Sequence, residues 1–133
     1  MMKGAKMKKQ INTQSAPAAI GPYSQGVIAG NLLFVSGQIP IDPATGNVVS
    51  ESIESQTTQV FKNLLAIISE AGSTFDDVVK LTIYLTDLEN FAAVNKIMES
   101  FFSKPFPARA TIEVSRLPKD VGVEIDAIAQ LKS

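Results

Sequence analysis

The order in which strand-like and helix-like patterns follow one another constrains the fold of this chain most. Two short apolar runs, 25–29 and 32–36, are joined by Gly30-Asn31, a two-residue connection typical of a β-hairpin. From 53 to 71 the apolar residues then recur three and four positions apart, which predicts a helix packed on one face.

The second half repeats this order. Apolar and polar residues alternate over 79–85, which predicts a half-buried strand, and Asp87 can cap a second helix. Two strands, 108–117 and 121–131, are expected to close the chain as a hairpin around the turn 118–120. Strands, helix, strand, helix and strands predict an α+β fold in which both helices cover one face of a mixed, mostly antiparallel sheet.

The expected closing hairpin has a consequence for two polar residues. Aligning its inward apolar residues places Glu124 opposite Glu113 or Ser115, four to six residues along the ladder from Arg109. That is roughly 13 to 20 Å at the usual rise per residue. If Arg109 and Glu124 serve one site, we therefore expect them to come from different subunits. The small, mixed residues of the second sheet face also favour an oligomer.

The composition limits the metal-binding and catalytic chemistry that this chain can perform. The 133 residues contain no Cys and no His, so zinc, copper or haem ligation and Ser-His or Cys-His catalysis are not expected. Of the 12 basic residues, four lie among the first nine; the other 8 face 13 acidic residues, a net charge of −5, which disfavours nucleic acid binding. We expect a single domain over 1–133, with 1–8 as a flexible extension, and a cytoplasmic protein with no membrane span.

Arg109 stands out because it is one of only two arginines, at the start of an alternating strand pattern in Phe106-Pro107-Ala108-Arg109-Ala110-Thr111. Its planar fork of donors suits a carboxylate or a phosphate. The alternative is a surface arginine in an ion pair on the sheet.

Several motifs resemble the Rid family of reactive-intermediate deaminases, also called the YjgF family. They are Ala16-Pro17-Ala18-Ala19-Ile20-Gly21-Pro22-Tyr23, Ser36-Gly37-Gln38-Ile39-Pro40, Phe91-Ala92-Ala93-Val94-Asn95, Phe106-Pro107-Ala108-Arg109, Arg116-Leu117-Pro118-Lys119-Asp120-Val121 and Val123-Glu124-Ile125. The resemblance runs from Met7 onward. It implies a chorismate-mutase-like fold with a six-stranded sheet, assembled as a homotrimer with sites between subunits. It also implies cofactor-free hydrolysis of enamine and imine acids such as 2-aminoacrylate to 2-keto acids and ammonia. Pyridoxal-phosphate-dependent dehydratases release such intermediates.

On this resemblance, roles can be given to individual residues. Arg109 is expected to bind the substrate carboxylate, with the backbone N–H of Gly37 as a further donor. Glu124 is expected to position or deprotonate the attacking water, and Tyr23 to close the cleft and donate through its hydroxyl. Secondary substrate contacts are expected from Ser36, Asn95 and Thr111.

Each residue also has a purely structural interpretation. Tyr23 could be a rim residue, Ser36 could end a strand, and Asn95 could bridge backbone groups. Glu124 could be an exposed strand residue. Many relatives have cysteine at the position of Thr111. Threonine, unlike cysteine, cannot supply a thiolate.

Two other function classes are open. The clefts could bind small carboxylates without turning them over, as a sensor or chaperone-like module. An endoribonuclease or translation-inhibitor role, attributed to some relatives, fits the acidic body of the chain poorly.

Overall fold

The computed structural model describes residues 7–132. The strands in this part of the chain are β1 (Lys8–Ile11), β2 (Gly26–Ala29), β3 (Leu32–Gln38), β4 (Val78–Leu85), β5 (Ala108–Glu113) and β6 (Val123–Gln130). The α-helices are α1 (Ile53–Glu70) and α2 (Phe91–Phe101), and short 3-10 turns η1, η2 and η3 occupy Phe75–Asp77, Leu88–Asn90 and Pro118–Asp120.

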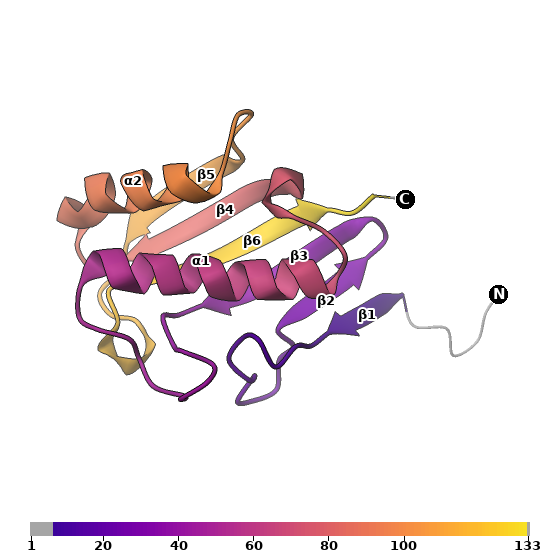
Figure 1. Ribbon diagram of the computed structural model, residues 1–133, viewed down its shortest axis with the longest axis horizontal. Helices are drawn as coiled ribbons and strands as arrows, with labels where there is room; N and C mark the ends of the chain where they lie inside the picture. Colours follow the sequence, from indigo (N-terminus) through magenta and orange to yellow (C-terminus); the bar gives the residue numbers. More distant parts are fainter. Residues whose placement is uncertain (1–6, 133) are drawn as a thin grey trace.

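The strands form one six-stranded sheet in the order β1-β2-β3-β6-β4-β5. Every pairing is antiparallel except that of β4 with β5, which is parallel and is connected through α2. Both helices lie on the same side of the sheet, with α1 against β3 and β6 and α2 beside α1 (Figure 1). The predicted α+β architecture with two helices on one face of a mixed, mostly antiparallel sheet is confirmed.

The predicted closing hairpin is wrong. β5 ends at Glu113 and pairs with β4, whereas β6 lies between β3 and β4. Glu124 therefore lies opposite Tyr84 on β4 and not opposite Glu113 or Ser115. The physical reason is burial: the inward residues of β6 are almost completely buried and need a neighbour on both sides, while β5 is exposed along most of its length and suits an edge.

The core lies between the sheet and the helices. The inward residues of β6 (Val123, Ile125, Ala127 and Ala129) and of β4 (Leu81, Ile83 and Leu85) are at most 2% exposed. Ser52 caps the start of α1 by accepting a hydrogen bond from the Ser55 N–H at 3.0 Å, as expected for a helix N-cap. No helix within residues 7–132 is long and apolar enough to span a bilayer.

The N-terminal region contains a strand that the sequence pattern did not indicate. β1 begins at Lys8, the last residue of the predicted extension, and pairs along its length with β2. Residues 1–6 lie outside the described part of the chain.

The face of the sheet turned away from the helices is covered by no other element in the described chain, and we call it the open face. The central strands place these side chains on it: Phe34 and Ser36 from β3, Glu124, Asp126 and Ile128 from β6, Lys80, Thr82 and Tyr84 from β4, and Ala108, Ala110 and Ile112 from β5. Phe34 and Ile112 are 43% and 45% exposed. Large apolar side chains on an otherwise polar face are typical of a surface that another chain covers.

Candidate active site

Arg109 lies on the helix side of the sheet, where it reaches α2. It is paired with the buried Leu81 in the β4–β5 register, so its side chain points to the same face as the core. Arg109 Nη1 donates a hydrogen bond to Asn95 Oδ1 and lies 3.6 Å from Met98 Sδ. Its guanidinium carbon is 5.1 Å from the centre of the Phe91 ring, within the range of a cation–π contact.

These contacts hold Arg109 at the wall of an open hollow of about 600 Å³, lined also by Asn95, Met98, Glu99, Phe106 and Pro107. Apolar surface beside a small number of polar and charged groups is the usual composition of a small-molecule site. Within residues 7–132, Arg109 forms no ion pair with an Asp or Glu side chain, whereas Arg116 bonds Asp120 at 2.7 Å. The alternative interpretation of Arg109 as part of a surface ion pair therefore finds no acidic partner in the described chain.

Thr111 follows Arg109 on the same face of β5, two residues along. Its Oγ1 is buried and has no hydrogen-bond partner in the described chain. Because buried hydroxyl groups nearly always find a partner, this oxygen is suited to a polar atom of a ligand. We call Arg109, Asn95 and Thr111 the arginine cluster.

Glu124 lies on the open face, against Gly37. A methyl group built on Gly37 would overlap Glu124 Oε2 and would lie 3.0 Å from its Cδ. Gly37 lies at an irregularity of the β3–β6 pairing, between Val35 and Gln38. Only a residue without a side chain allows the carboxylate to lie on the β3 backbone here. We call Ser36, Gly37 and Glu124 the glutamate cluster.

Ser36 connects this cluster to Tyr23. The Ser36 N–H donates to the Gln25 carbonyl at 2.9 Å, and Ser36 Oγ donates to the Ser24 carbonyl. These bonds fix the backbone directly after Tyr23, whose side chain is 53% exposed. Ser36 thus holds the Tyr23 segment against β3.

The two clusters lie on opposite faces of the sheet. Arg109 and Glu124 are separated by two strand spacings and three residues of rise, so their Cα atoms are about 14 Å apart, with side chains pointing in opposite directions. One chain cannot place both on one small substrate. The expectation that the two residues act from different subunits therefore rests on this geometry and not on the hairpin register.

The sequence patterns did not single out three neighbours of these clusters. Phe91, named above only as part of a motif, is 40% exposed, and the guanidinium of Arg109 lies over its ring. Tyr84 and Asp126 lie beside Glu124 on the open face, and Tyr84 Oη donates to Asp126 Oδ2 at 2.9 Å. The only sequence signal for Tyr84 and Asp126 was the alternation of polar and apolar residues along β4 and β6.

Burial raises the pKa of the Glu124 carboxyl above its ordinary value, and the nearby Asp126 carboxylate raises it further. The folded state then holds this proton more tightly than the unfolded state does. Between the ordinary and the raised pKa, the free energy of unfolding must therefore fall as the pH rises. A carboxyl group that lowers the free energy of unfolding in this way is typical of a functional site.

Glu124→Gln should remove this loss of stability at higher pH. We expect the variant to be more stable than the wild type at pH 8, with a smaller difference at pH 4, because the wild-type carboxyl is protonated there. Urea unfolding at both pH values measures it. A difference that does not change with pH would contradict the raised pKa.

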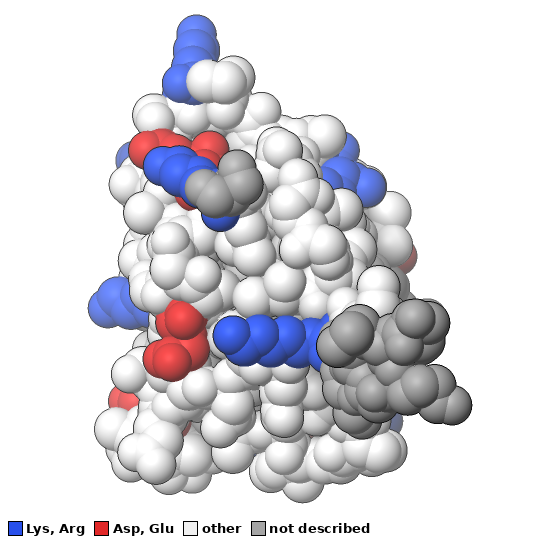
Figure 2. Space-filling model, turned by 90° about the vertical axis from the view of Figure 1, so that its right-hand side faces the viewer, with Lys and Arg blue, Asp and Glu red and all other residues white. Residues whose placement is uncertain are grey.

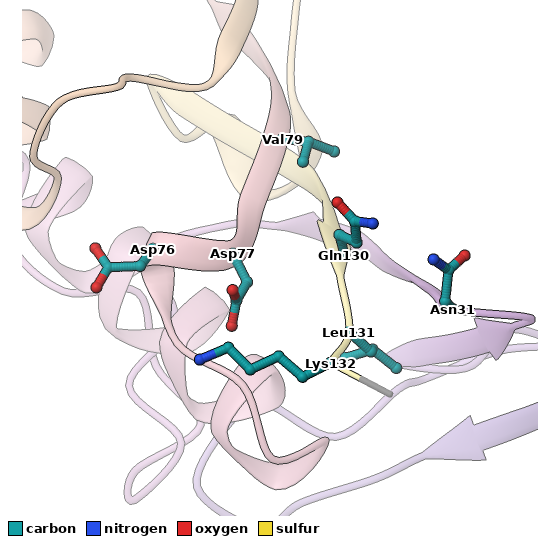
Figure 3. Close-up of a pocket in the computed structure, with 7 residues that line it drawn as sticks. All are labelled: Asn31, Asp76, Asp77, Val79, Gln130, Leu131 and Lys132. Carbon is teal, nitrogen blue, oxygen red and sulfur yellow. The ribbon is translucent and has the colours of Figure 1, made fainter.

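A second hollow, of about 440 Å³, contains none of these residues (Figure 3). Asp76 and Asp77 line one side of it and Gln130 and Asn31 the other, and Lys132 extends across it toward Asp77. Within residues 7–132, no three Asp or Glu side chains come close enough together to hold a metal ion.

Figure 2 shows the side of the molecule on which α1 ends. In places basic and acidic side chains lie next to one another there on a mostly uncharged surface, and the visible described atoms form no continuous basic area.

Comparison with known proteins gives consistent matches over most of the chain. The profile of the family described as Endoribonuclease L-PSP matches residues 13–131. A 2-iminobutanoate/2-iminopropanoate deaminase of Salmonella typhimurium is 51% identical over 126 residues, which cover 92% of this chain and 98% of the relative.

Two solved structures also match over most of the chain. The Rid-family protein YyfA of Yersinia pestis has a TM-score of 0.92 and 50% identity, over 93% of this chain and 99% of the other. Escherichia coli TdcF with bound serine has a TM-score of 0.89 and 43% identity, also over 93% and 99%. The arginine and glutamate clusters lie within the matched length, and the chain belongs to the Rid family, known also as the YjgF or L-PSP family.

Proposed function

We propose that this protein hydrolyses 2-imino acids, including the imine of 2-aminoacrylate, to 2-keto acids and ammonia. The observation that carries the proposal is Arg109, held by Asn95 and Phe91 at the wall of a partly apolar hollow without an acidic partner in the described chain. The 51% identity to a 2-iminobutanoate/2-iminopropanoate deaminase over nearly the whole chain supports the same reaction.

The proposed site forms between subunits of a homotrimer. The arginine cluster of one subunit would face the glutamate cluster of the next, since the two clusters lie on opposite faces of one sheet. The open face, with Phe34 and Ile112 partly exposed, is the surface we assign to this assembly. The number three follows from the family resemblance, and sedimentation equilibrium measures it.

In the proposed mechanism, Arg109 binds the substrate carboxylate through two N–H donors and orients the imine carbon. The Gly37 N–H and the Thr111 hydroxyl add further hydrogen bonds, and Tyr23 closes the cleft. Glu124 accepts a proton from water as its oxygen bonds to the imine carbon and the C=N π electrons move to nitrogen. The proton then passes to that nitrogen, which gives a carbinolamine. Glu124 next accepts the proton of the carbinolamine hydroxyl and passes it to the nitrogen, the C=O double bond forms as the C–N bond breaks, and the 2-keto acid and ammonia are released.

The decisive experiment generates the imine with an excess of a pyridoxal-phosphate-dependent threonine dehydratase and follows its decay. We expect the purified protein to accelerate the decay over buffer in proportion to its concentration. Saturable binding of 2-oxobutanoate without faster decay would instead show a carboxylate-binding module. An unchanged decay rate and no such binding would contradict the whole assignment.

A further inference from the structure

Glu124 is enclosed on the open face by groups from three strands. Gly37 of β3 lies against its carboxylate, and Tyr84 of β4 lies directly opposite it in the β4–β6 register. Asp126 follows it on the same face of β6, two residues along. The Glu124 side chain thus lies between the backbone of β3 and Tyr84 of β4.

Tyr84 and Asp126 are themselves joined. Tyr84 Oη donates to Asp126 Oδ2 at 2.9 Å, and the bond runs diagonally between the strands because Asp126 is paired with Thr82. Burial, followed by this bond, raises the pKa of the Tyr84 hydroxyl. Tyr84 therefore remains protonated, and remains a donor, throughout the neutral range.

The charges that face Glu124 within the described chain are few. β3 presents Phe34, Ser36 and Gly37, none of which titrates in the neutral range, and β5 presents only Ala and Ile residues. β4 adds Tyr84 and, four residues away, Lys80. Asp126 is thus the carboxylate nearest to Glu124 on this face, about 7 Å away along the strand.

We propose that Tyr84 and Asp126 are positioning residues for Glu124: Asp126 makes Glu124 a better proton acceptor, and the Tyr84 hydroxyl limits that effect by sharing the Asp126 charge. This inference rests on the proposed function of Glu124 as the group that exchanges a proton with water. A general base is most effective when its pKa lies near the working pH, because it can then both accept and return the proton.

The charge of Asp126 and the hydrogen bond from Tyr84 change the proton affinity of Glu124 in opposite directions, so their effects can be measured separately. Asp126→Asn keeps an oxygen for Tyr84 but removes the negative charge, so Glu124 should lose its proton at lower pH. Tyr84→Phe keeps the ring but removes the donor, which leaves the Asp126 charge unshared, so Glu124 should hold its proton to higher pH. A residue with only a structural role would not produce shifts in opposite directions.

The test is the pH profile of kcat/KM for 2-iminobutanoate hydrolysis, whose acidic limb reports the free enzyme. We expect Asp126→Asn to move this limb down by about 0.5 to 1 pH unit, the Coulomb effect of one charge at this separation. Tyr84→Phe should move it up by a smaller amount. In the Asp126→Asn background, Tyr84→Phe should no longer move it.

Thr82→Val is the matched control, because Thr82 is paired with Asp126 on the same face without a hydrogen bond to its carboxylate. The acidic limb of the kcat/KM profile of Thr82→Val should coincide with that of the wild type. Equal shifts in one direction, no shift, or a full Tyr84→Phe shift in the double variant would overturn the inference.

A second measurement separates this inference from the proposed function. Titration of the Glu124 carboxyl carbon by ¹³C NMR, without substrate, should show the same two opposite shifts in the same variants. If the wild type turns over no imine but the titrations shift as stated, the proposed function fails and the electrostatic coupling stands. If turnover is normal and the titrations do not move, only the coupling fails.

Discussion

Replacing Arg109 with alanine should lower kcat/KM for imine hydrolysis on the order of 10³-fold. Two hydrogen bonds to a charged carboxylate contribute about 1.5 to 3 kcal/mol each, and every 1.4 kcal/mol is a factor of ten. The fold should be retained because Arg109 lies at the exposed edge strand β5. The coupled dehydratase assay measures the loss, and calorimetry should show that 2-oxobutanoate binding is lost with it.

Arg109→Lys separates charge from geometry. Lysine keeps the positive charge but has neither the planar fork nor the guanidinium face that lies on Phe91. We therefore expect it to recover only a small part of the lost activity.

Arg116 provides the control, since it is the only other arginine. Its side chain is 78% exposed and bonded to Asp120, so Arg116→Ala should leave kcat/KM close to that of the wild type. Full activity in Arg109→Ala, or equal losses in the two alanine variants, would remove Arg109 from the mechanism.

Local sequence patterns predicted the elements that depend on local physics. The hairpin of β2 and β3 was found from its Gly30-Asn31 turn, and Gly30 does adopt a positive φ of 62°. The first helix was predicted from the three-and-four spacing of its apolar residues over 53–71, and α1 runs from Ile53 to Glu70. In each case, residues close in the chain determine the outcome.

The pairing of β5 and β6 could not be found in this way. The two strands are neighbours in sequence, and the turn between them resembles a hairpin turn, yet β4 lies between them. What decides their places is the burial of each whole strand within the sheet. β1 escaped notice for a related reason: its sequence, Lys8–Ile11, has little strand character of its own, and the pairing with β2 supplies its hydrogen bonds.

The candidate site shows the same division. Arg109 and Glu124 were singled out from motifs, and the structure places Arg109 beside Asn95 and Glu124 against Gly37. The neighbours of Glu124 were missed because they come from the register of β3 and β4 against β6. Gly37 was identified for its N–H, whereas the structure gives its missing side chain an additional role.

Gly37→Ala should lower kcat roughly 10²-fold, because a displacement of about 1 Å in a catalytic group can have that effect. The new methyl group would overlap Glu124 Oε2. Since the overlapping atoms are the end of a flexible side chain, Glu124 can rotate away at little cost in stability. We therefore expect a nearly unchanged unfolding midpoint in urea, with a kcat loss similar to that of Glu124→Gln.

Gly122→Ala is the matched control for this effect. Its methyl group would meet Gln56 and Ile53 atoms at 3.4 Å, an ordinary contact, and would not reach Glu124. Activity should therefore be retained in this variant. In the double variant Gly37→Ala/Glu124→Gln, the two losses should not add, because both remove the same carboxylate from the same place. Additive losses would mean that the new methyl group impairs the site without displacing the Glu124 carboxylate.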